Sequence, residues 1–359
     1  MDSPGKNIVI LIGQLVFGGA EKQSLLLAKT LSDHYRVQYV VMKPFKVVNS
    51  YEQYLAESGL QYEILTGSLS ARLVRLVRLL RAFRTDLLFC YLPGDNIAGT
   101  FAGKLAGVPH IIGGIRNTKI VKSKFYLLRF VQKYFQDYVI FNSSRAMEIF
   151  CSKGYRRDRS VVIENAFADK LNFIERPGND PVNILMVGRF VAQKDYLTGI
   201  KAVATLSGLV TEKKIRLVIA GYGILEPQVR EWVKAHDLDE LTEFHIQPDN
   251  LPELYHRSDI YLNSSLFEGF SNAVMEAMAH GLPVVATRTG DIDKLVSIEK
   301  TGYIAEVGDH EGLGKGLDLL CRDHPGRIAF GREGHQRLFD SFGLEPYKEK
   351  YIRFIQSLT

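Results

Sequence analysis

The chain of 359 residues is 46% hydrophobic and 24% charged, the composition of a globular protein that is long enough for two domains with separate cores. Three widely spaced cysteines, Cys90, Cys151 and Cys321, exclude a dense disulfide framework or a cysteine metal cluster and suggest a reducing compartment. The net charge of +5 is uneven, since residues 1–165 carry 23 Lys and Arg against 12 Asp and Glu, whereas residues 166–359 carry 22 against 28. This split predicts that the first half faces an anionic partner.

Apolar, strand-like runs alternate with helical patterns along the first half, which predicts a parallel α/β sheet. The opening run, Lys6 to Phe17, is similar to a short signal peptide, but no small-residue cleavage pattern follows it, so we expect a first strand at Asn7 to Gly13. No apolar run approaches the roughly 18 residues that span a bilayer. Further strands are expected at 37–42, 62–65, 86–91, 110–113 and 138–142.

Gly18 and Gly19 lie where the first strand turns into a helix that is expected from Ala20 to Leu31. Glycines at such a turn let backbone amides approach a phosphate closely. An isolated pair of glycines is more often only a tight turn, and the residues alone leave both interpretations open.

Two predicted helices of the first half are rich in basic residues. From Ala71 to Arg84, five arginines recur at intervals of three with leucine and valine between them, and a solvated face over a buried leucine face is the favoured interpretation. From Lys119 to Phe135, basic residues are mixed with aromatic and aliphatic ones. This composition suits an interfacial helix that touches anionic lipid, and it suits an ordinary packed helix equally well.

A second α/β unit is expected to begin near Val161, with a loop at 176–181 before a strand at Val182–Val187. Arg189 and Lys194 follow that strand. A guanidinium and an ammonium at the C-terminal end of a strand form a clamp for a diphosphate, the arginine by bidentate contact and the lysine as a point charge. Surface ion pairs are the alternative. Later in the chain we expect strands at 216–220 and 260–263 and helices at 225–236 and 342–358.

The stretch from Glu268 to Thr287 predicts a loop, one helix and a short strand at Val284–Thr287, with Gly281 in the left-handed position past the helix. Glu268 precedes the helix and Glu276 lies two turns later, so a carboxylate that can hold sugar hydroxyls lies on each side of the helix N-terminus. Free backbone N–H groups between the two acids form an anion seat, and they belong to Phe270, Ser271, Asn272 and Ala273. Two solvated acids beside an ordinary amphipathic helix are the alternative.

In this context the stretch resembles the donor-site signature of the retaining glycosyltransferases of family 4, the group 1 glycosyltransferases. Residues 188–195 are similar to that family's G-R-x4-K-G, with Asp195 in place of the last glycine, and Gly18 and Gly19 match its glycine-rich first loop. The resemblance implies the GT-B fold, an α/β architecture of two Rossmann-like domains that face a deep cleft, with a C-terminal helix that crosses back. The implied domains are an acceptor domain of residues 1–168 with 343–359 and a nucleotide-sugar domain of residues 169–342.

The implied function is retaining transfer of a sugar from a nucleotide sugar, in particular a UDP-sugar, to a hydroxyl of a growing cell-surface glycan or a polyprenyl-linked glycan. The resemblance implies a place at the inner face of the cell membrane. We expect no metal or other cofactor and no nucleic-acid partner, and the composition of Lys119–Phe135 leads us to expect that the N-terminal domain contacts anionic lipid. Asp291 and Asp293 form a D-x-D that we interpret as structural. The implied catalytic residues are Arg189, Lys194 and Glu268, and the implied donor-binding residues are Gly18, Gly19, Phe270, Ser271, Asn272, Ala273 and Glu276.

Many members of the family carry a histidine near the donor sugar, just after the strand that follows a Gly-Val-Pro. Here His110 begins that strand, and residues 114–117 occupy the usual place of the histidine. We therefore expect Arg116, together with Asn117, to do its work by donating to the donor or to an anionic group on the acceptor. Arginine stays protonated at working pH, so it is no general base. An ion pair with a neighbouring acid is the alternative.

Two other classes of protein stay open on the sequence. A nucleotide-sugar epimerase of related fold would use the same donor cleft but would need no basic, apolar docking surface. A non-catalytic partner subunit that keeps the fold would be expected to lose part of the clamp or one glutamate, whereas this chain keeps Arg189, Lys194, Glu268 and Glu276.

Overall fold

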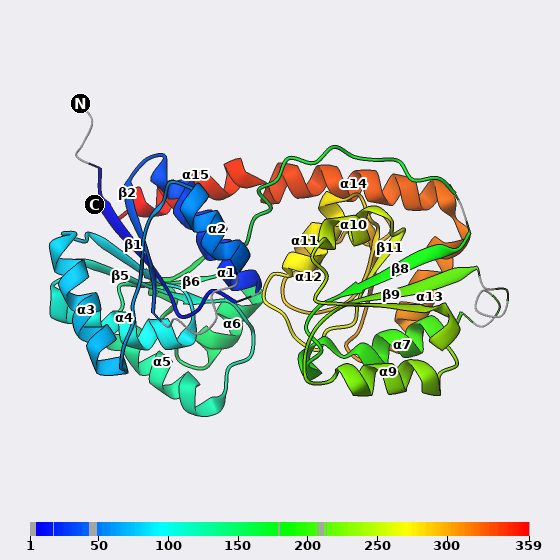
Figure 1. The fold of residues 1–359 in the computed structure, drawn as a ribbon, viewed down its shortest axis with the longest axis horizontal. Coiled ribbons are helices and arrows are strands. Elements are labelled where there is room, and N and C mark those ends of the chain that lie inside the picture. Colours follow the sequence, from blue (N-terminus) through cyan, green and yellow to red (C-terminus); the bar gives the residue numbers. More distant parts are fainter. Residues whose placement is uncertain are drawn as a thin grey trace. The chain divides into compact units, whose positions relative to one another are not determined.

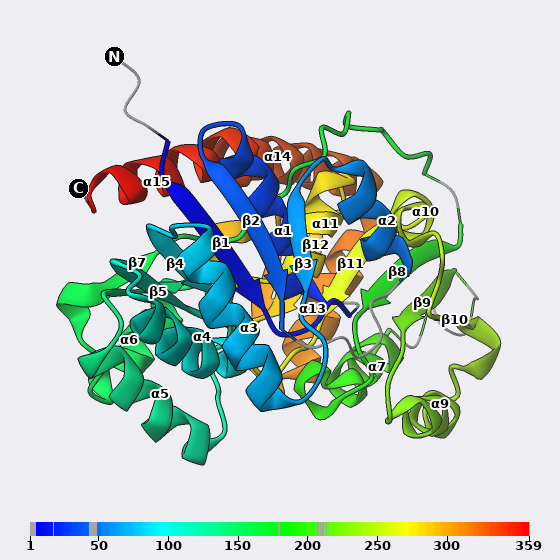
Figure 2. The same ribbon diagram turned by 60° about the vertical axis from the view of Figure 1, so that its left-hand side comes forward.

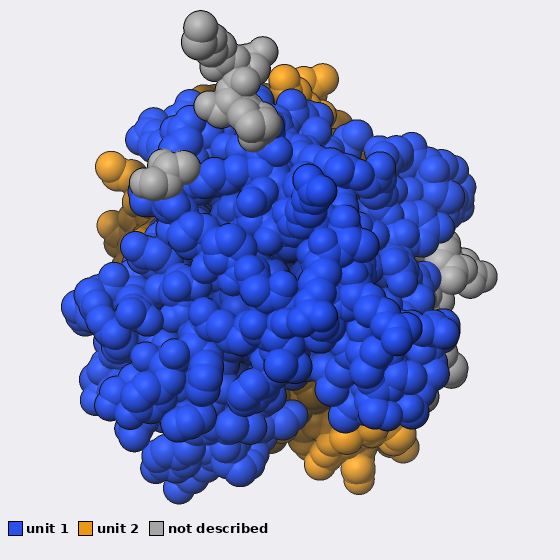
Figure 3. Space-filling model, turned by 90° about the vertical axis from the view of Figure 1, so that its left-hand side faces the viewer, with its two compact units in different colours: residues 1–165, 344–359 blue, residues 166–343 orange. Residues whose placement is uncertain are grey.

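The structure, shown as ribbons in Figure 1 and Figure 2, is a computed structural model that describes residues 5–16, 18–42, 49–178, 180–206, 208, 212 and 214–358. It contains two compact units, which Figure 3 colours separately. Unit 1 consists of residues 1–165 and 344–359, and unit 2 consists of residues 166–343. Each unit is built around one parallel sheet, as the alternation of strands and helices predicts.

Unit 1 contains a seven-stranded sheet in the order β3-β2-β1-β4-β5-β6-β7. Its strands are β1 (Asn7–Ile12), β2 (Arg36–Val41), β3 (Gln61–Ile64), β4 (Leu87–Cys90), β5 (His110–Ile115), β6 (Tyr138–Phe141) and β7 (Ser160–Val162). Its helices are α1 (Gly19–Ser32), α2 (Asn49–Glu57), α3 (Leu69–Ala82), α4 (Pro93–Ala106), α5 (Lys122–Tyr134), α6 (Ser144–Ser152), the short η1 (Arg157–Arg159) and, from the end of the chain, α15 (Leu344–Gln356).

Strand β1 lies in the middle of this sheet and is apolar along its length, because helices cover both faces of a parallel sheet. Residues 8–12 have no exposed surface, and Ile8 pairs in register with Val37 of β2 and Leu87 of β4. The chain order along the sheet reverses between β1 and β4. Open α/β sheets bind ligands beyond the carboxyl ends of their strands at such a switch point.

Unit 2 contains a six-stranded sheet in the order β10-β9-β8-β11-β12-β13. Its strands are β8 (Val182–Val187), β9 (Ile215–Gly221), β10 (Thr242–Ile246), β11 (Ile260–Asn263), β12 (Val284–Thr287) and β13 (Gly302–Ala305). Its helices are α7 (Tyr196–Ala204), α9 (Glu226–Ala235), α10 (Leu251–His256), α11 (Asn272–Ala279), α12 (Ile292–Leu295), α13 (His310–Arg322) and α14 (His324–Phe342), with short helices η2 (Ala192–Lys194) and η3 (Asp239–Leu241).

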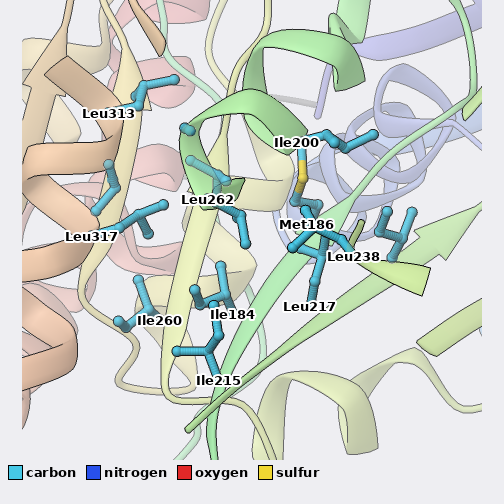
Figure 4. Packing of buried hydrophobic residues seen from close by; sticks show 14 of the residues in the cluster. Ile184, Met186, Ile200, Ile215, Leu217, Leu238, Ile260, Leu262, Leu313 and Leu317 are labelled. Carbon is cyan, nitrogen blue, oxygen red and sulfur yellow. The ribbon is translucent and has the colours of Figure 1, made fainter. Parts of the chain in front are cut away.

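Side chains of β8 alternate between two cores, one on each face of the sheet. Ile184 and Met186 join the cluster in Figure 4, where they lie near Leu217 of β9 and Leu262 of β11. Leu185 points to the other face and joins a separate cluster with residues of α11. Buried on both faces, β8 gives the loop that follows it a rigid base.

Most expected elements agree with the structure, and β8, β11 and β12 have the predicted bounds. The prediction that the second α/β unit begins near Val161 is wrong. Val161 pairs with Ile140 as part of β7, the edge strand of unit 1, and unit 2 begins at Ala166. An apolar run predicts a strand, but it does not specify which sheet the strand joins.

The expected final helix is α15, which begins after Gly343 and belongs to unit 1. The ring of Tyr351 contacts Phe89 of β4 edge-on, with 6.1 Å between centroids. The chain therefore returns to unit 1 after unit 2 is complete, as the crossing helix of the GT-B resemblance predicts.

Candidate active site

Two cations follow β8 in unit 2, as the sequence predicts. The Arg189 side chain is exposed, and its guanidinium makes no hydrogen bond or ion pair with any residue that the structure describes. Lys194, at the end of η2, is mostly buried, with 18% of its side chain exposed. The guanidinium is thus available to a ligand, whereas the ammonium is already held in place.

Glu268 holds the ammonium of Lys194. Its Oε1 lies 2.6 Å from Lys194 Nζ and accepts a hydrogen bond of 2.9 Å from the hydroxyl of Ser265. The Gln193 amide donates to Glu268 Oε2 at 3.3 Å and to the carbonyl of Phe267 at 2.8 Å. The loops after β8 and β11 are therefore joined, so two predicted site residues that are 74 positions apart come into contact.

Asp195 takes the backbone conformation that the family's glycine would allow. Its φ of 42° and ψ of 55° lie in the left-handed region, which aspartate tolerates better than most residues. Its Oδ2 accepts a hydrogen bond of 2.6 Å from Thr198 in the first turn of α7, and its carbonyl accepts one of 2.8 Å from Ser264. The departure from the family pattern is thus accommodated locally.

The anion seat lies at the start of α11. Ser271 is the N-cap residue, but its side chain does not cap the helix and instead accepts a hydrogen bond of 3.4 Å from Asn263. The Phe270 ring is buried against Phe342, with 4.9 Å between centroids. The Phe270 side chain is therefore part of the core of unit 2. Gly281 follows the helix with φ of +71°, which confirms its predicted left-handed conformation.

Glu276 accepts a hydrogen bond of 3.0 Å from the hydroxyl of Tyr255, a residue that the sequence did not single out. Burial raises the pKa of Tyr255 well above its usual value, and the charge of Glu276 adds to this effect. The tyrosine therefore stays a neutral donor to the carboxylate. The His280 ring stacks on it at 5.1 Å, and burial lowers the pKa of that imidazole. In the sequence, the hydrogen bond between Tyr255 and Glu276 could have been suspected only from the presence of a tyrosine in the short helix α10, just before β11.

Gly18 and Gly19 lie at the start of α1 in unit 1. Gly18 is the N-cap residue, with extended backbone, and a Cβ there would lie 2.2 Å from Oε2 of Glu21. A Cβ on Gly13, after β1, would similarly lie 2.8 Å from Oδ1 of Asp95 in α4. Glycines at these positions thus leave room for two buried carboxylates, which are 7% and 4% exposed.

Glu21 and Asp95 lie at the switch point between β1 and β4. Burial raises the pKa of Tyr39 in β2 well above its usual value, and the negative charges of both carboxylates raise it further. Asp95 also accepts a hydrogen bond of 3.0 Å from the backbone of Leu92. Neither carboxylate was predicted to have a role from the sequence. The available signal was a Pro-Gly-Asp that directly follows an apolar strand.

Arg116 follows β5 and is half-buried beneath aromatic rings. Its Cζ lies 4.0 Å from the centroid of the Tyr91 ring, and its Nε is buried without a hydrogen-bond partner among the described residues. Tyr347 and Tyr351 of α15 complete the surroundings. The structure shows no ion pair between Arg116 and a described acid, so aromatic rings surround the guanidinium where the alternative interpretation placed a carboxylate.

Among the described residues, no group of three or more His, Cys, Asp and Glu side chains is arranged to hold a metal ion. The two aspartates of the D-x-D pair with cations, Asp291 with Lys294 at 3.1 Å and Asp293 with Arg288. Within the same described part of the chain, no helix combines the length and the apolar character that crossing a bilayer requires.

Two successive Rossmann-like units, the second with Arg189 and Lys194 after β8 and Glu268 after β11, are the arrangement of the GT-B glycosyltransferase folds. Residues 168–337 match the family described as Glycosyl transferases group 1. The matching region lies within unit 2, so unit 2 is a domain of the group 1 glycosyltransferases.

A crystal structure of Anabaena HepE in complex with UDP-glucose is similar over 98% of this chain and 99% of that chain, with a TM-score of 0.85 at 17% identity. This similarity confirms the predicted fold. Among sequence relatives, the lipopolysaccharide core biosynthesis glycosyltransferase LpsE of Rhizobium meliloti (strain 1021) is 24% identical over 226 residues. That match covers 62% of this chain and 64%, less than two thirds, of LpsE. The capsular polysaccharide biosynthesis glycosyltransferase CapM of Staphylococcus aureus is 23% identical over 94% of this chain and 90% of its own length.

Proposed function

We propose that this chain is a retaining glycosyltransferase that moves a sugar from a UDP-sugar to a hydroxyl of a growing cell-surface or polyprenyl-linked glycan. The observation that carries the proposal is the Lys194–Glu268 ion pair, which joins the loop that carries Arg189 to the loop that leads into α11. A nucleotide sugar presents a diphosphate beside a ring of hydroxyls. The cations Arg189 and Lys194 suit the diphosphate, and the carboxylates suit the hydroxyls.

The relatives support the finer parts of the proposal. HepE is named with UDP-glucose bound, which favours uridine as the base. LpsE and CapM are named for lipopolysaccharide core and capsular polysaccharide biosynthesis, which favours a cell-surface glycan as the acceptor. We assign donor binding to unit 2 and acceptor binding to the switch point of unit 1, beside Glu21 and Asp95, and we place the reaction at the inner face of the cell membrane.

In the proposed reaction, the acceptor hydroxyl attacks the anomeric carbon from the face that the diphosphate leaves. The bond from that carbon to the phosphate oxygen breaks, and the departing phosphate takes the proton of the hydroxyl. Arg189 and Lys194 stabilise the negative charge that develops on the phosphate, which is the main catalytic contribution. The protein's own cations supply this charge, so the reaction needs no metal ion.

A panel of nucleotide sugars without acceptor tests the proposal. We expect UDP-sugars to raise the melting temperature, since a ligand of the folded state stabilises it, and one of them to release free sugar slowly. Release of an epimerised nucleotide sugar would instead support an epimerase. Stabilisation without turnover, even with glycan acceptors present, would support a non-catalytic subunit, and stabilisation by no nucleotide sugar would refute the donor site.

Replacing each glutamate by glutamine should separate the two carboxylates. Glu276, next to Tyr255, is assigned to the ribose, so Glu276→Gln should weaken binding of both UDP and the donor. Glu268, next to Lys194, is assigned to the transferred sugar, so Glu268→Gln should spare UDP binding and lower turnover. Calorimetric titration with UDP checks both variants. Equal losses of UDP affinity would contradict the assignment.

Tyr255→Phe provides a matched control for Glu276. It removes the hydroxyl that donates to the carboxylate and leaves the buried ring in place. We expect a loss of UDP affinity smaller than that of Glu276→Gln, because the carboxylate keeps its charge. A loss larger than that of Glu276→Gln would show that Tyr255 acts through something other than Glu276.

A further inference from the structure

The outer surface of α3, α4 and α5 in unit 1 carries cations but no exposed carboxylate. The three helices pack side by side, α3 against α4 and α4 against α5. Their only acidic residue is Asp95, which is 4% exposed. Seven exposed basic side chains lie on them: Arg75, Arg78, Arg81, Lys104, Lys122, Lys124 and Lys133. The positive charge of this surface is therefore not balanced locally.

The exposed side of α5 is also aromatic. Tyr126, Phe130 and Tyr134 recur every four residues, so they form one stripe along the helix, and they are 62%, 49% and 58% exposed. The opposite side of α5 buries Leu128 and Val131. A helix that packs one apolar side into a core normally turns a polar side outward, whereas α5 mixes large aromatic rings with its exposed lysines.

The aromatic stripe continues onto α4. The Phe135 ring lies 5.7 Å from Phe130 and 5.7 Å from Phe101 of α4, and Leu105 follows one turn later with 68% of its surface exposed. Within the described part of the chain, 9 of the 17 exposed large hydrophobic side chains fall in residues 69–134. These residues are a small part of the chain, so the hydrophobic exposure is concentrated there.

We propose that this surface, the basic–aromatic face of α3, α4 and α5, docks unit 1 onto an anionic lipid bilayer. Lysines keep their charge among the lipid headgroups while aromatic rings enter the interface below them. Single-stranded nucleic acid would also attract cations and stack on the aromatic rings. The aliphatic side chains of Leu69, Leu105 and Leu127, all exposed, would gain nothing from bases, and they favour lipid.

The proposal goes beyond the transferase proposed above, because it depends on neither donor nor acceptor. Co-sedimentation with vesicles of phosphatidylcholine alone, or mixed equally with phosphatidylglycerol, tests it. We expect binding to the anionic vesicles only, and partial release by salt, which screens the electrostatic attraction. Binding to neither kind of vesicle, or equal binding to both, would overturn the proposal.

Charge reversal at Lys122, Lys124 and Lys133 to Glu should weaken vesicle binding at least about 100-fold, since one lysine near an anionic surface contributes about fivefold. The matched control changes Lys234, Lys300 and Lys315 to Glu, three exposed lysines of unit 2 that alter the net charge equally. This control should bind as the wild type does. An equal loss in the control would mean that net charge, and not this face, drives the binding.

Replacing Tyr126, Phe130 and Tyr134 by Ser keeps every charge and should weaken binding at least about tenfold, because apolar surface no longer enters the interface. Phe130→Trp should show a blue-shifted emission when vesicles are added, against the baseline of Trp232 in unit 2. An unaffected serine variant, an unshifted emission from Phe130→Trp, or single-stranded RNA that competes as well as anionic vesicles would overturn lipid docking.

Donor hydrolysis and stabilisation by UDP provide a readout that is separate from docking. The side chains replaced on the basic–aromatic face are all exposed in unit 1. Donor hydrolysis, stabilisation by UDP and the melting temperature of these variants should therefore match the wild type. Vesicle binding lost with donor hydrolysis intact confirms the face independently of the transferase. If the wild type itself shows no donor hydrolysis, the proposed transferase activity is refuted, but the vesicle result still tests lipid docking.

Discussion

Lys194→Ala is expected to lower turnover by about 10²–10³-fold, the loss found when one preorganised donor to a developing anion is removed. The ammonium is fixed before any ligand arrives, because Glu268 holds it at 2.6 Å. It therefore costs no reorganisation when charge develops on the leaving phosphate. Turnover measured with saturating donor, with and without manganese, checks this expectation. A strict requirement for manganese would contradict the mechanism.

The contact between Lys194 and Glu268 makes their effects interdependent. Groups that act as a unit are not additive, so Lys194→Ala combined with Glu268→Gln should lose little more than the worse single variant. Removal of Lys194 leaves Glu268 with donors from Ser265 and Gln193, so the fold should tolerate the change. Lys234→Ala, on the exposed side of α9, is the matched control. Strictly multiplicative losses would show that the two residues act separately.

Arg189→Ala should lower turnover about as much as Lys194→Ala does, but for a different structural reason. Arg189 is exposed and has no partner among the described residues, so it is free to move onto the diphosphate. Its replacement should leave the melting temperature unchanged and weaken stabilisation by UDP. Unchanged turnover in Arg189→Ala would remove this residue from the clamp.

The sequence pattern was sufficient to predict the parallel sheets and to predict which strands the site residues follow. The strand at 182–187 was predictable because it is apolar without interruption, and Arg189 and Lys194 were predictable because they follow it directly. The pairing of Lys194 with Glu268 was not predictable from spacing, since it depends on how the loops after β8 and β11 meet. Local pattern predicts elements, whereas contacts over 74 positions depend on the fold.

The same limit explains the other differences. The edge strand β7 was expected to open the second α/β unit, although the implied first domain of residues 1–168 contains it, because an apolar run is similar in either sheet. Tyr255, Glu21 and Asp95 were missed because a buried polar side chain in a helix has no distinctive local pattern. The left-handed Asp195 was anticipated only as a departure from glycine, and its bond to Thr198 became visible in the structure.

Arg116→Ala is expected to lower turnover by about 10²-fold, the size of losing one charged donor near the reacting centre. The guanidinium lies on the ring of Tyr91, and its Nε is buried without a partner among the described residues, so the stacking fixes the plane of the side chain. A planar cation held this way can present its remaining N–H groups in one direction. Because arginine does not titrate near neutrality, the pH profile of the residual activity should keep its shape.

Arg116→Lys and Tyr91→Leu separate charge from orientation. Lysine keeps the charge but lacks the planar fork that stacks on the ring, so it should recover only a small part of the lost turnover. Tyr91→Leu keeps Arg116 but removes the ring beneath it, and turnover should fall while the KM for the donor changes less, as expected for a positioning residue. If Arg116→Ala or Arg116→Glu has wild-type turnover, the arginine takes no part in the reaction, and its contact with Tyr91 serves only to pack the end of β5 against the end of β4.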